Sequence, residues 1–176
     1  QREVLKLFVQ QGGRLVDSSP MYGESESVIG DLAAELDVTG KLFLATKVWT
    51  AGREDGIRQM EQSFQRLRTK KMDLMQVHNL LDWKTHLKTL RDWKAQGRIR
   101  YLGITHYTES AYDDLARVMQ SEDIDFVQFN YSIISRAAEQ RLLPLAQEKK
   151  IAVLVNKPFE KAGVFRGGKP AIVGDP

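Results

Sequence analysis

The segment Met72-Asp73-Leu74-Met75-Gln76-Val77-His78 decides the fold of this chain. It is a short, mainly apolar run of strand length, and apolar residues at helical spacing lie on both sides of it, over residues 57–67 and 87–93. An apolar strand between two amphipathic helices is typical of a parallel sheet whose faces are covered by helices.

The same unit recurs in both directions along the chain. Outward from residues 72–78, we expect strands to begin near residues 14, 42, 73, 100, 126 and 151, so that successive strands start 25–31 residues apart. Helical patterns fill the intervals and also precede the first strand. We expect these helices over residues 1–11, 24–38, 57–67, 87–93, 108–119 and 138–149, the last with Pro144 at a turn or kink.

Two closures of such a sheet compete, an open doubly wound sheet and a (β/α)₈ barrel. An open dinucleotide-binding sheet normally has a glycine-rich turn after its first strand, and the pattern G-x-G-x-x-G does not occur in this sequence. We therefore predict an α/β fold of the (β/α)₈ TIM-barrel type, incomplete, with six βα units. Residues 1–160 would form this partial barrel domain, and residues 161–176 a glycine- and proline-rich loop or tail.

Composition excludes several classes of partner. Lysine and arginine exceed aspartate and glutamate by 26 − 23 = 3, and the charges are interleaved, so nucleic acid is not the expected partner. No apolar run approaches the roughly 18 residues of a spanning helix, which argues against a membrane partner. The chain has no cysteine, so no thiolate metal site is available, and a reducing compartment such as the cytoplasm is the expected location.

Titratable residues stand at the ends of the first three expected strands, where a barrel places its chemistry. These residues are Asp17, Lys47 and His78, and Tyr22 follows Asp17 in a tight turn. A tyrosine exchanges protons near neutral pH only beside a cation, which Lys47 could supply while Asp17 orients it. A neutral His78 could donate a hydrogen bond to a carbonyl oxygen that gains negative charge. This chemistry reduces a carbonyl, and it requires a hydride donor, of which nicotinamide is the simplest.

Three segments in this order resemble the aldo-keto reductases. They are residues 15–23 (LVDSSPMYG), 45–49 (ATKVW) and 73–79 (DLMQVHN). The resemblance covers most of the chain and implies that Tyr22 is the general acid in a tetrad with Asp17, Lys47 and His78. It also implies that an aldehyde or ketone is reduced by NADPH, which lies extended across the barrel mouth.

The resemblance also assigns cofactor and substrate positions. Thr105 and His106 stand where the family has a Ser-Asn pair on the nicotinamide amide, and Asn156 stands where many members have a stacking tyrosine. The full set of cofactor positions is Thr105, His106, Gln128, Asn156, Pro158 and Gly163. Met21 and Trp49 would line the substrate pocket.

Other interpretations remain open. Taken singly, Asp17 and Lys47 could be a structural ion pair, Tyr22 a packing aromatic and His86 a surface residue. Lys47 or Lys157 could form a Schiff base in an aldolase-like barrel, with Tyr22 as its proton shuttle. A third alternative is a non-catalytic relative that binds the cofactor or regulates.

Length separates this chain from a complete barrel, which typically takes about 250 residues. By the resemblance, the strands not seen in these 176 residues are the first and the eighth, so we expect a fragment of a longer reductase. An open arc exposes two sheet edges and apolar lining. We expect it to self-associate through these edges or to be inactive alone.

Overall fold

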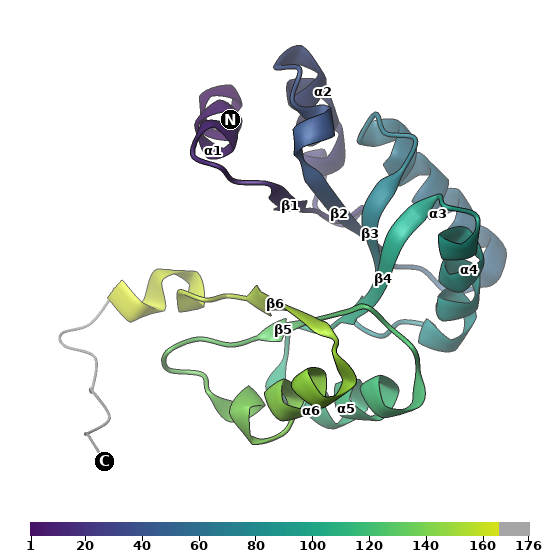
Figure 1. Ribbon diagram of the computed structural model, residues 1–176, viewed down its shortest axis with the longest axis vertical. Helices are drawn as coiled ribbons and strands as arrows, with labels where there is room; N and C mark the ends of the chain where they lie inside the picture. Colours follow the sequence, from purple (N-terminus) through teal and green to yellow (C-terminus); the bar gives the residue numbers. More distant parts are fainter. Residues whose placement is uncertain (166–176) are drawn as a thin grey trace.

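The computed structural model describes residues 1–165 and contains one six-stranded parallel sheet, curled into an open arc (Figure 1). The strands are β1 (Leu15–Asp17), β2 (Phe43–Val48), β3 (Met72–His78), β4 (Ile99–Thr105), β5 (Phe126–Asn130) and β6 (Ala152–Asn156). Each strand pairs with its sequence neighbours, in the order β1-β2-β3-β4-β5-β6. The predicted partial barrel is therefore confirmed as a fold, with all six strands in the predicted order.

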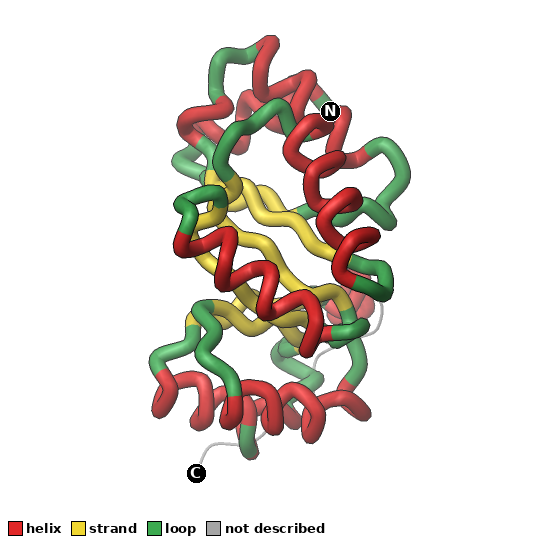
Figure 2. Tube along the Cα trace, turned by 90° about the vertical axis from the view of Figure 1, so that its right-hand side faces the viewer, coloured by secondary structure: helices red, strands yellow, loops and turns green. Residues whose placement is uncertain are grey.

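The helices cover the convex outer side of the arc. They are α1 (Arg2–Gln10), α2 (Ser25–Glu35), α3 (Arg53–Arg66), α4 (Trp83–Ala95), α5 (Tyr112–Ser121) and α6 (Leu142–Lys149), with short 3₁₀ helices η1 (Thr39–Lys41), η2 (Glu109–Ala111), η3 (Ala137–Gln140) and η4 (Glu160–Phe165). Figure 2 shows the strands, in yellow, between these helices. The main core lies between the helices and the sheet, where side chains such as Met60, Met75 and Leu90 are fully buried. Among the described residues, no helix is long and apolar enough to cross a membrane.

The concave inner side of the arc carries two layers of side chains. The rings of Phe43, Tyr101 and Phe126 come from β2, β4 and β5, and their centroids lie 5.4–6.1 Å apart. Rings from strands that are not neighbours can meet in this way only on the inside of the curl. The polar side chains lie further along the strands, because alternate residues of a strand share a face: Gln128 follows Phe126 by one inward position, and Lys47 and Thr105 follow Phe43 and Tyr101 by two.

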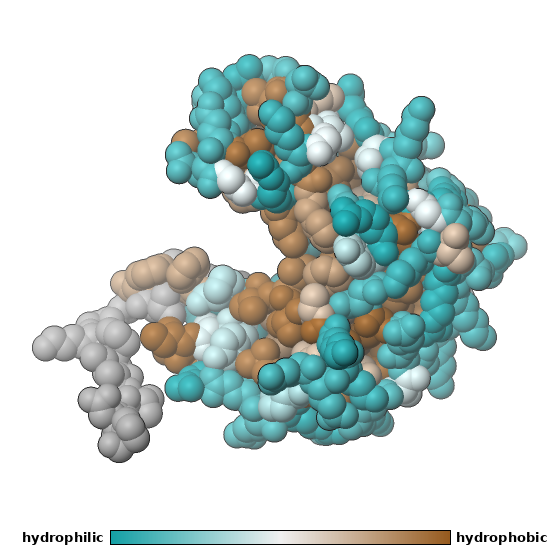
Figure 3. All heavy atoms as spheres, viewed as in Figure 1, coloured by the Kyte–Doolittle hydropathy of each residue, from teal (hydrophilic) through white to brown (hydrophobic). Residues whose placement is uncertain are grey.

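Hydrophobic side chains, brown in Figure 3, gather in the hollow of the arc, and the outer surface is mainly hydrophilic. Within residues 1–165, no strand pairs with the outer edge of β1 or of β6. Leu15 on β1 and Val155 on β6 remain 39% and 41% exposed. The sheet thus ends in two edges that carry accessible apolar side chains.

Three local expectations were wrong. The helix expected over 138–149 is divided into η3 and α6, and Pro144 is the third residue of α6, where a backbone N–H has no partner within the helix. Residues 161–165, expected to be loop, belong to η4, and 166–176 lie outside the described residues. His86 is not on the surface: it is 0% exposed, because its side of α4 faces α3 and the segment after β2.

Candidate active site

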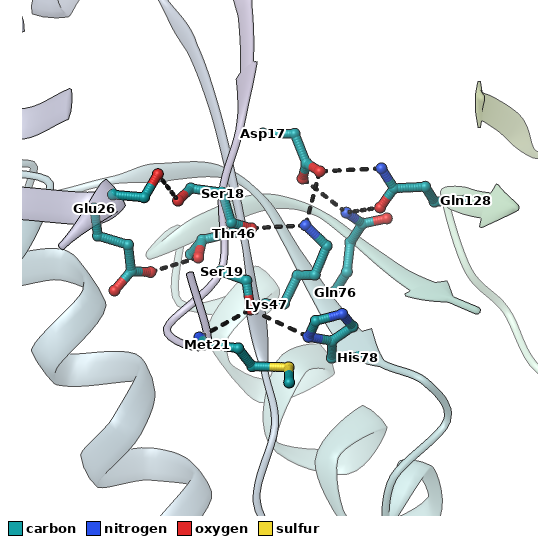
Figure 4. A network of polar contacts seen from close by, with 11 residues as sticks. Asp17, Ser18, Ser19, Met21, Glu26, Thr46, Lys47, Gln76, His78 and Gln128 are labelled. Atoms are coloured by element: carbon teal, nitrogen blue, oxygen red, sulfur yellow. Dashed lines mark hydrogen bonds and ion pairs between the residues drawn. The ribbon is translucent and has the colours of Figure 1, made fainter. Parts of the chain in front are cut away.

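A hydrogen-bonded network joins side chains of four strands near the carboxyl ends of these strands (Figure 4). The ammonium of Lys47 on β2 donates to Oδ2 of Asp17, the last residue of β1, over 2.7 Å, and to the carbonyl of Ser18 over 2.6 Å. Gln128 of β5 donates to the same carboxylate oxygen over 3.0 Å, and Gln76 of β3 donates to the other over 3.4 Å. Asp17 is therefore the centre on which β1, β2, β3 and β5 converge.

Lys47 is a nearly fully buried member of this network. Its side chain is 2% exposed, against 20% for that of Asp17. Burial lowers the pKa of Lys47 below its usual value, and the neighbouring Asp17 carboxylate opposes that shift. A buried ammonium is tolerated when it is paired and hydrogen-bonded, which Asp17 and the Ser18 carbonyl accomplish here.

His78, at the end of β3, is held in its neutral form. Its pKa falls to about 4, first because the ring is buried and second because the Lys47 cation is near. Nδ1 lies 3.1 Å from Oγ of Ser19, which already accepts the N–H of Met21 over 3.3 Å. The Ser19 hydroxyl proton is thus free to donate to Nδ1, an arrangement that leaves the ring proton on Nε2.

Tyr22 lies beside both of these groups, in the turn after β1. Its ring is 6.0 Å from that of His78 in an edge-on arrangement, and Lys47 Nζ lies 5.3 Å from its ring centroid. Burial, and then the Asp17 charge, raise the pKa of Tyr22, while the Lys47 ammonium beside its ring donates to Asp17. Tyr22 is therefore a protonated phenol at neutral pH, able to donate.

A cavity of about 580 Å³ opens in front of these three side chains. Its lining residues come from the ends of β1 to β4 and of β6: Met21, Tyr22, Lys47, Trp49, His78, Asn79, Thr105, Tyr107, Asn156 and Lys157. A second groove, of about 640 Å³, lies between α1 and α2 and is lined mainly by aliphatic side chains, without Lys47 or His78. The first cavity is the candidate active site, because apolar walls and convergent polar groups meet there.

The residues expected to contact the cofactor are only partly brought together. Thr105 and Asn156 line the cavity, and Gln128 lies behind it in the Asp17 network. His106 instead lines a separate cavity beside α4 and α5, and its Nδ1 accepts the N–H of Thr108 over 3.3 Å. Pro158 and Gly163 are exposed and do not belong to the cavity lining. Met21 and Trp49 both lie in the cavity wall.

Tyr107 is a cavity residue that the sequence reasoning missed. It is 51% exposed, and Lys157 donates to its carbonyl over 3.3 Å while its ammonium lies 5.2 Å from the ring centroid. The signal was present in the sequence, because Tyr107 is two residues beyond the inward-facing Thr105 and continues the same alternation past the end of β4.

Comparison with known proteins finds relatives along nearly the whole chain. The sequence model of the Aldo/keto reductase family matches residues 1–171. Methylglyoxal reductase YeaE of Escherichia coli (strain K12) is 30% identical over 179 residues, covering 97% of this chain and 62% of that protein. Aldo-keto reductase YhdN of Bacillus subtilis (strain 168) is 27% identical, covering 87% of this chain and 50% of its own length. The chain thus spans between half and two thirds of the length of these two relatives.

Solved structures show the same architecture. An aldo-keto reductase from Klebsiella pneumoniae in complex with NADPH superimposes with a TM-score of 0.79 at 24% identity, over 95% of this chain and 60% of that one. At this identity the likeness concerns the fold. The family match over residues 1–171 is the decisive finding: the chain belongs to the aldo/keto reductase family.

Proposed function

We propose that this protein reduces an aldehyde or ketone to an alcohol with hydride from NADPH, and that Tyr22 donates the proton. The observation that carries the proposal is the shared cavity, into which Tyr22, Lys47 and His78 all open above the Asp17 network. A protonated phenol and a neutral imidazole, both facing one apolar-walled space, suit the polarisation and protonation of a carbonyl oxygen.

In this proposal each side chain has one task. His78 donates from Nε2 to the carbonyl oxygen, because Ser19 occupies Nδ1. Tyr22 gives its hydroxyl proton to that oxygen as negative charge develops there. Lys47 then stabilises the phenolate that is left, and Asp17 holds the ammonium in place.

The cavity also suits a nicotinamide ring. Thr105 and Asn156 present polar side chains that could bind the carboxamide, and Tyr107 is the aromatic side chain on that wall, where Asn156 cannot stack. When bound, NADPH supplies the hydride. One relative, 27% identical over 89% of this chain, is named NADH-specific methylglyoxal reductase, so both nucleotides belong in the assay.

Several relatives are named methylglyoxal reductases, which makes a small 2-oxoaldehyde the first substrate to assay. The test is the loss of NADPH absorbance on adding methylglyoxal. Tyr22→Phe should lower turnover at least ~10²-fold, from loss of general-acid catalysis. Tyr131→Phe is the matched control, because its hydroxyl donates to Glu139, away from the cavity, and it should retain wild-type turnover. Near-wild-type reduction by Tyr22→Phe would refute the assignment.

A Schiff-base mechanism is the second candidate, and burial of Lys47, which lowers its pKa, is the observation in its favour. Against it, the Lys47 ammonium is engaged by Asp17 and the Ser18 carbonyl. Borohydride should trap substrate on Lys47 or Lys157 if that mechanism operates. Under the reductase proposal no adduct forms, and replacing Lys157 leaves reduction largely intact. A non-catalytic relative would bind NADPH without consuming it.

A further inference from the structure

The segment after β2 carries Trp49, whose indole is 41% exposed and whose ring centroid lies 6.4 Å from that of His78. Trp49 therefore faces the atoms at which the proposed reaction takes place. No hydrogen bond restrains the indole itself among the described residues, so its position depends on the backbone that carries it.

That backbone is held by side chains of α3 and α4. Gln59 of α3 binds both polar groups of Trp49: its Oε1 accepts the Trp49 N–H over 2.5 Å, and its Nε2 donates to the Trp49 carbonyl over 3.3 Å. One amide side chain thus satisfies the backbone at the point where the β2 ladder ends.

His86 of α4 holds the next residue. Its Nε2 lies 2.6 Å from the carbonyl oxygen of Thr50, and because a carbonyl can only accept, Nε2 carries the proton. The ring is 0% exposed, and its Nδ1 has no hydrogen-bond partner in the part of the chain that the structure describes. Gly56 of α3 allows this approach, since a Cβ there would lie 2.5 Å from the His86 ring. A polar ring buried at the cost of an unpaired nitrogen indicates that the Thr50 bond matters.

Asp82, just before α4, is the third side chain that binds the backbone of the segment after β2. Its Oδ2 accepts the N–H of Gly52 over 2.8 Å, and its Oδ1 accepts the Thr85 hydroxyl over 2.7 Å. Asp82 has the left-handed backbone conformation, with φ +46°, as do Asn79 and Leu80 directly after His78. Asparagine and aspartate tolerate the left-handed conformation, but it is unfavourable for Leu80, so the segment that links His78 to α4 has a specific shape.

We propose that Gln59, Asp82 and His86, which we call the loop clamp, are positioning residues that fix Trp49 over the cavity and thereby limit the size of the carbonyl substrate. None of the three lines the cavity. Substrate size would then be set in part from the outer side of the sheet, through the backbone of residues 49–52. The kinetic part of this inference rests on the proposed reductase function, but the placement of Trp49 does not.

The first test is therefore independent of activity. The chain has three tryptophans, so protein labelled with 5-fluorotryptophan gives three ¹⁹F resonances, and Trp49→Phe identifies that of Trp49. His86→Leu removes the donor at similar volume and should shift or broaden the Trp49 resonance while that of Trp93 stays. His86→Gln places a donor near the position of Nε2 and should restore the wild-type resonance. Thr89→Val is the matched control, because Thr89 is another buried α4 residue whose hydroxyl has no partner among residues 1–165.

The second test is selectivity. The ratio of kcat/KM for 4-nitrobenzaldehyde to that for propanal should change about fivefold or more in His86→Leu, while kcat for propanal stays within about twofold, since small substrates do not reach a displaced Trp49. Gln59→Leu should act in the same direction and provides a second variant if His86→Leu does not fold.

Two results would overturn the inference. One is a Trp49 resonance that is unchanged in both His86→Leu and Gln59→Leu, and the other is a resonance that moves equally in Thr89→Val. If no aldehyde is reduced at all, the proposed function fails, while the ¹⁹F comparison still decides whether the clamp holds Trp49.

Discussion

Replacing Asp17 by asparagine should destabilise the protein more than removing its partner Lys47. Asp17→Asn keeps the side-chain shape but removes the charge that compensates a nearly fully buried ammonium, which retains the Ser18 carbonyl at 2.6 Å and at most a neutral amide oxygen. Asparagine also offers one acceptor oxygen where the carboxylate offers two, so Gln76 or Gln128 loses its acceptor.

The magnitude follows from which charge is left behind. Removing one partner of a buried ion pair costs about 3–5 kcal/mol, and we expect the lower end, about 3 kcal/mol, because Asp17 is partly exposed. Lys47→Met leaves Asp17 with water and two amide donors, so its cost should be about 1.5–2 kcal/mol, the lower part of the usual range for a lost hydrogen bond to a charged group. The order of the two variants is thus set by the 2% and 20% exposures of the two side chains.

The dependence on pH gives a second signature. Asp17 raises the pKa of Lys47 in the folded protein, so Asp17→Asn lowers that pKa further below the 10.5 of the unfolded chain. The difference in free energy of unfolding between wild type and Asp17→Asn is therefore largest at pH values below the lowered pKa of Lys47 in the variant. This difference becomes smaller as the pH rises toward the pKa of Lys47 in the folded wild-type protein, because Lys47 of the variant is then already neutral.

Urea denaturation followed by circular dichroism, at several pH values, measures both quantities. If Asp17→Asn costs no more than Lys47→Met, or if its cost does not shrink as pH rises, the view that Asp17 compensates a buried ammonium is refuted.

Three further predictions test other parts of the structure. Gly30→Ala should cost roughly 3 kcal/mol in urea denaturation, because its Cβ would lie 2.1 Å from a backbone oxygen at the end of α3, while Gly40→Ala, which meets open space, should change little. Because the pKa of His78 is about 4, protonation of His78 should not lower kcat/KM near pH 6.5 and should lower it only toward pH 4. A decrease in kcat/KM near pH 6.5 that disappears in His78→Gln would contradict this. Tyr112→Phe should cost about 1 kcal/mol of stability, because it removes the hydroxyl that donates to the Asn130 carbonyl over 2.6 Å, and an unchanged unfolding midpoint would contradict that.

Much of the fold could be predicted because each strand begins as an apolar run of its own and each helix has its own periodicity. The residues at the strand ends were also accessible to sequence reasoning, since the alternation along a strand places Lys47 and His78 on one face of the sheet. Both depend on local pattern alone.

What could not be predicted depends on contacts between distant segments. His86 is polar and lies in a helix, so its burial follows only from the approach of α3 at Gly56, thirty residues earlier. His106 turns toward Thr108 and away from the cavity. The raised pKa of Tyr22 follows from the burial of its ring and from the nearby Asp17 carboxylate, which a strand register does not specify.

The strand order has a consequence for how the molecule folds and opens. Because every strand pairs only with its neighbours in sequence, the arc is a nearly one-dimensional array, in which order can start at one βα unit and propagate outward in both directions. Each parallel pair must still close a whole crossover before its hydrogen bonds form, and this makes the pairing slow compared with that of a hairpin. The array also implies a gradient of protection against hydrogen exchange, highest in β3 and β4 at the middle and lowest in β1 and β6. Asp17 stands at the fraying end of that gradient, so opening of β1 would release the Lys47 ammonium from its partner before the interior strands exchange.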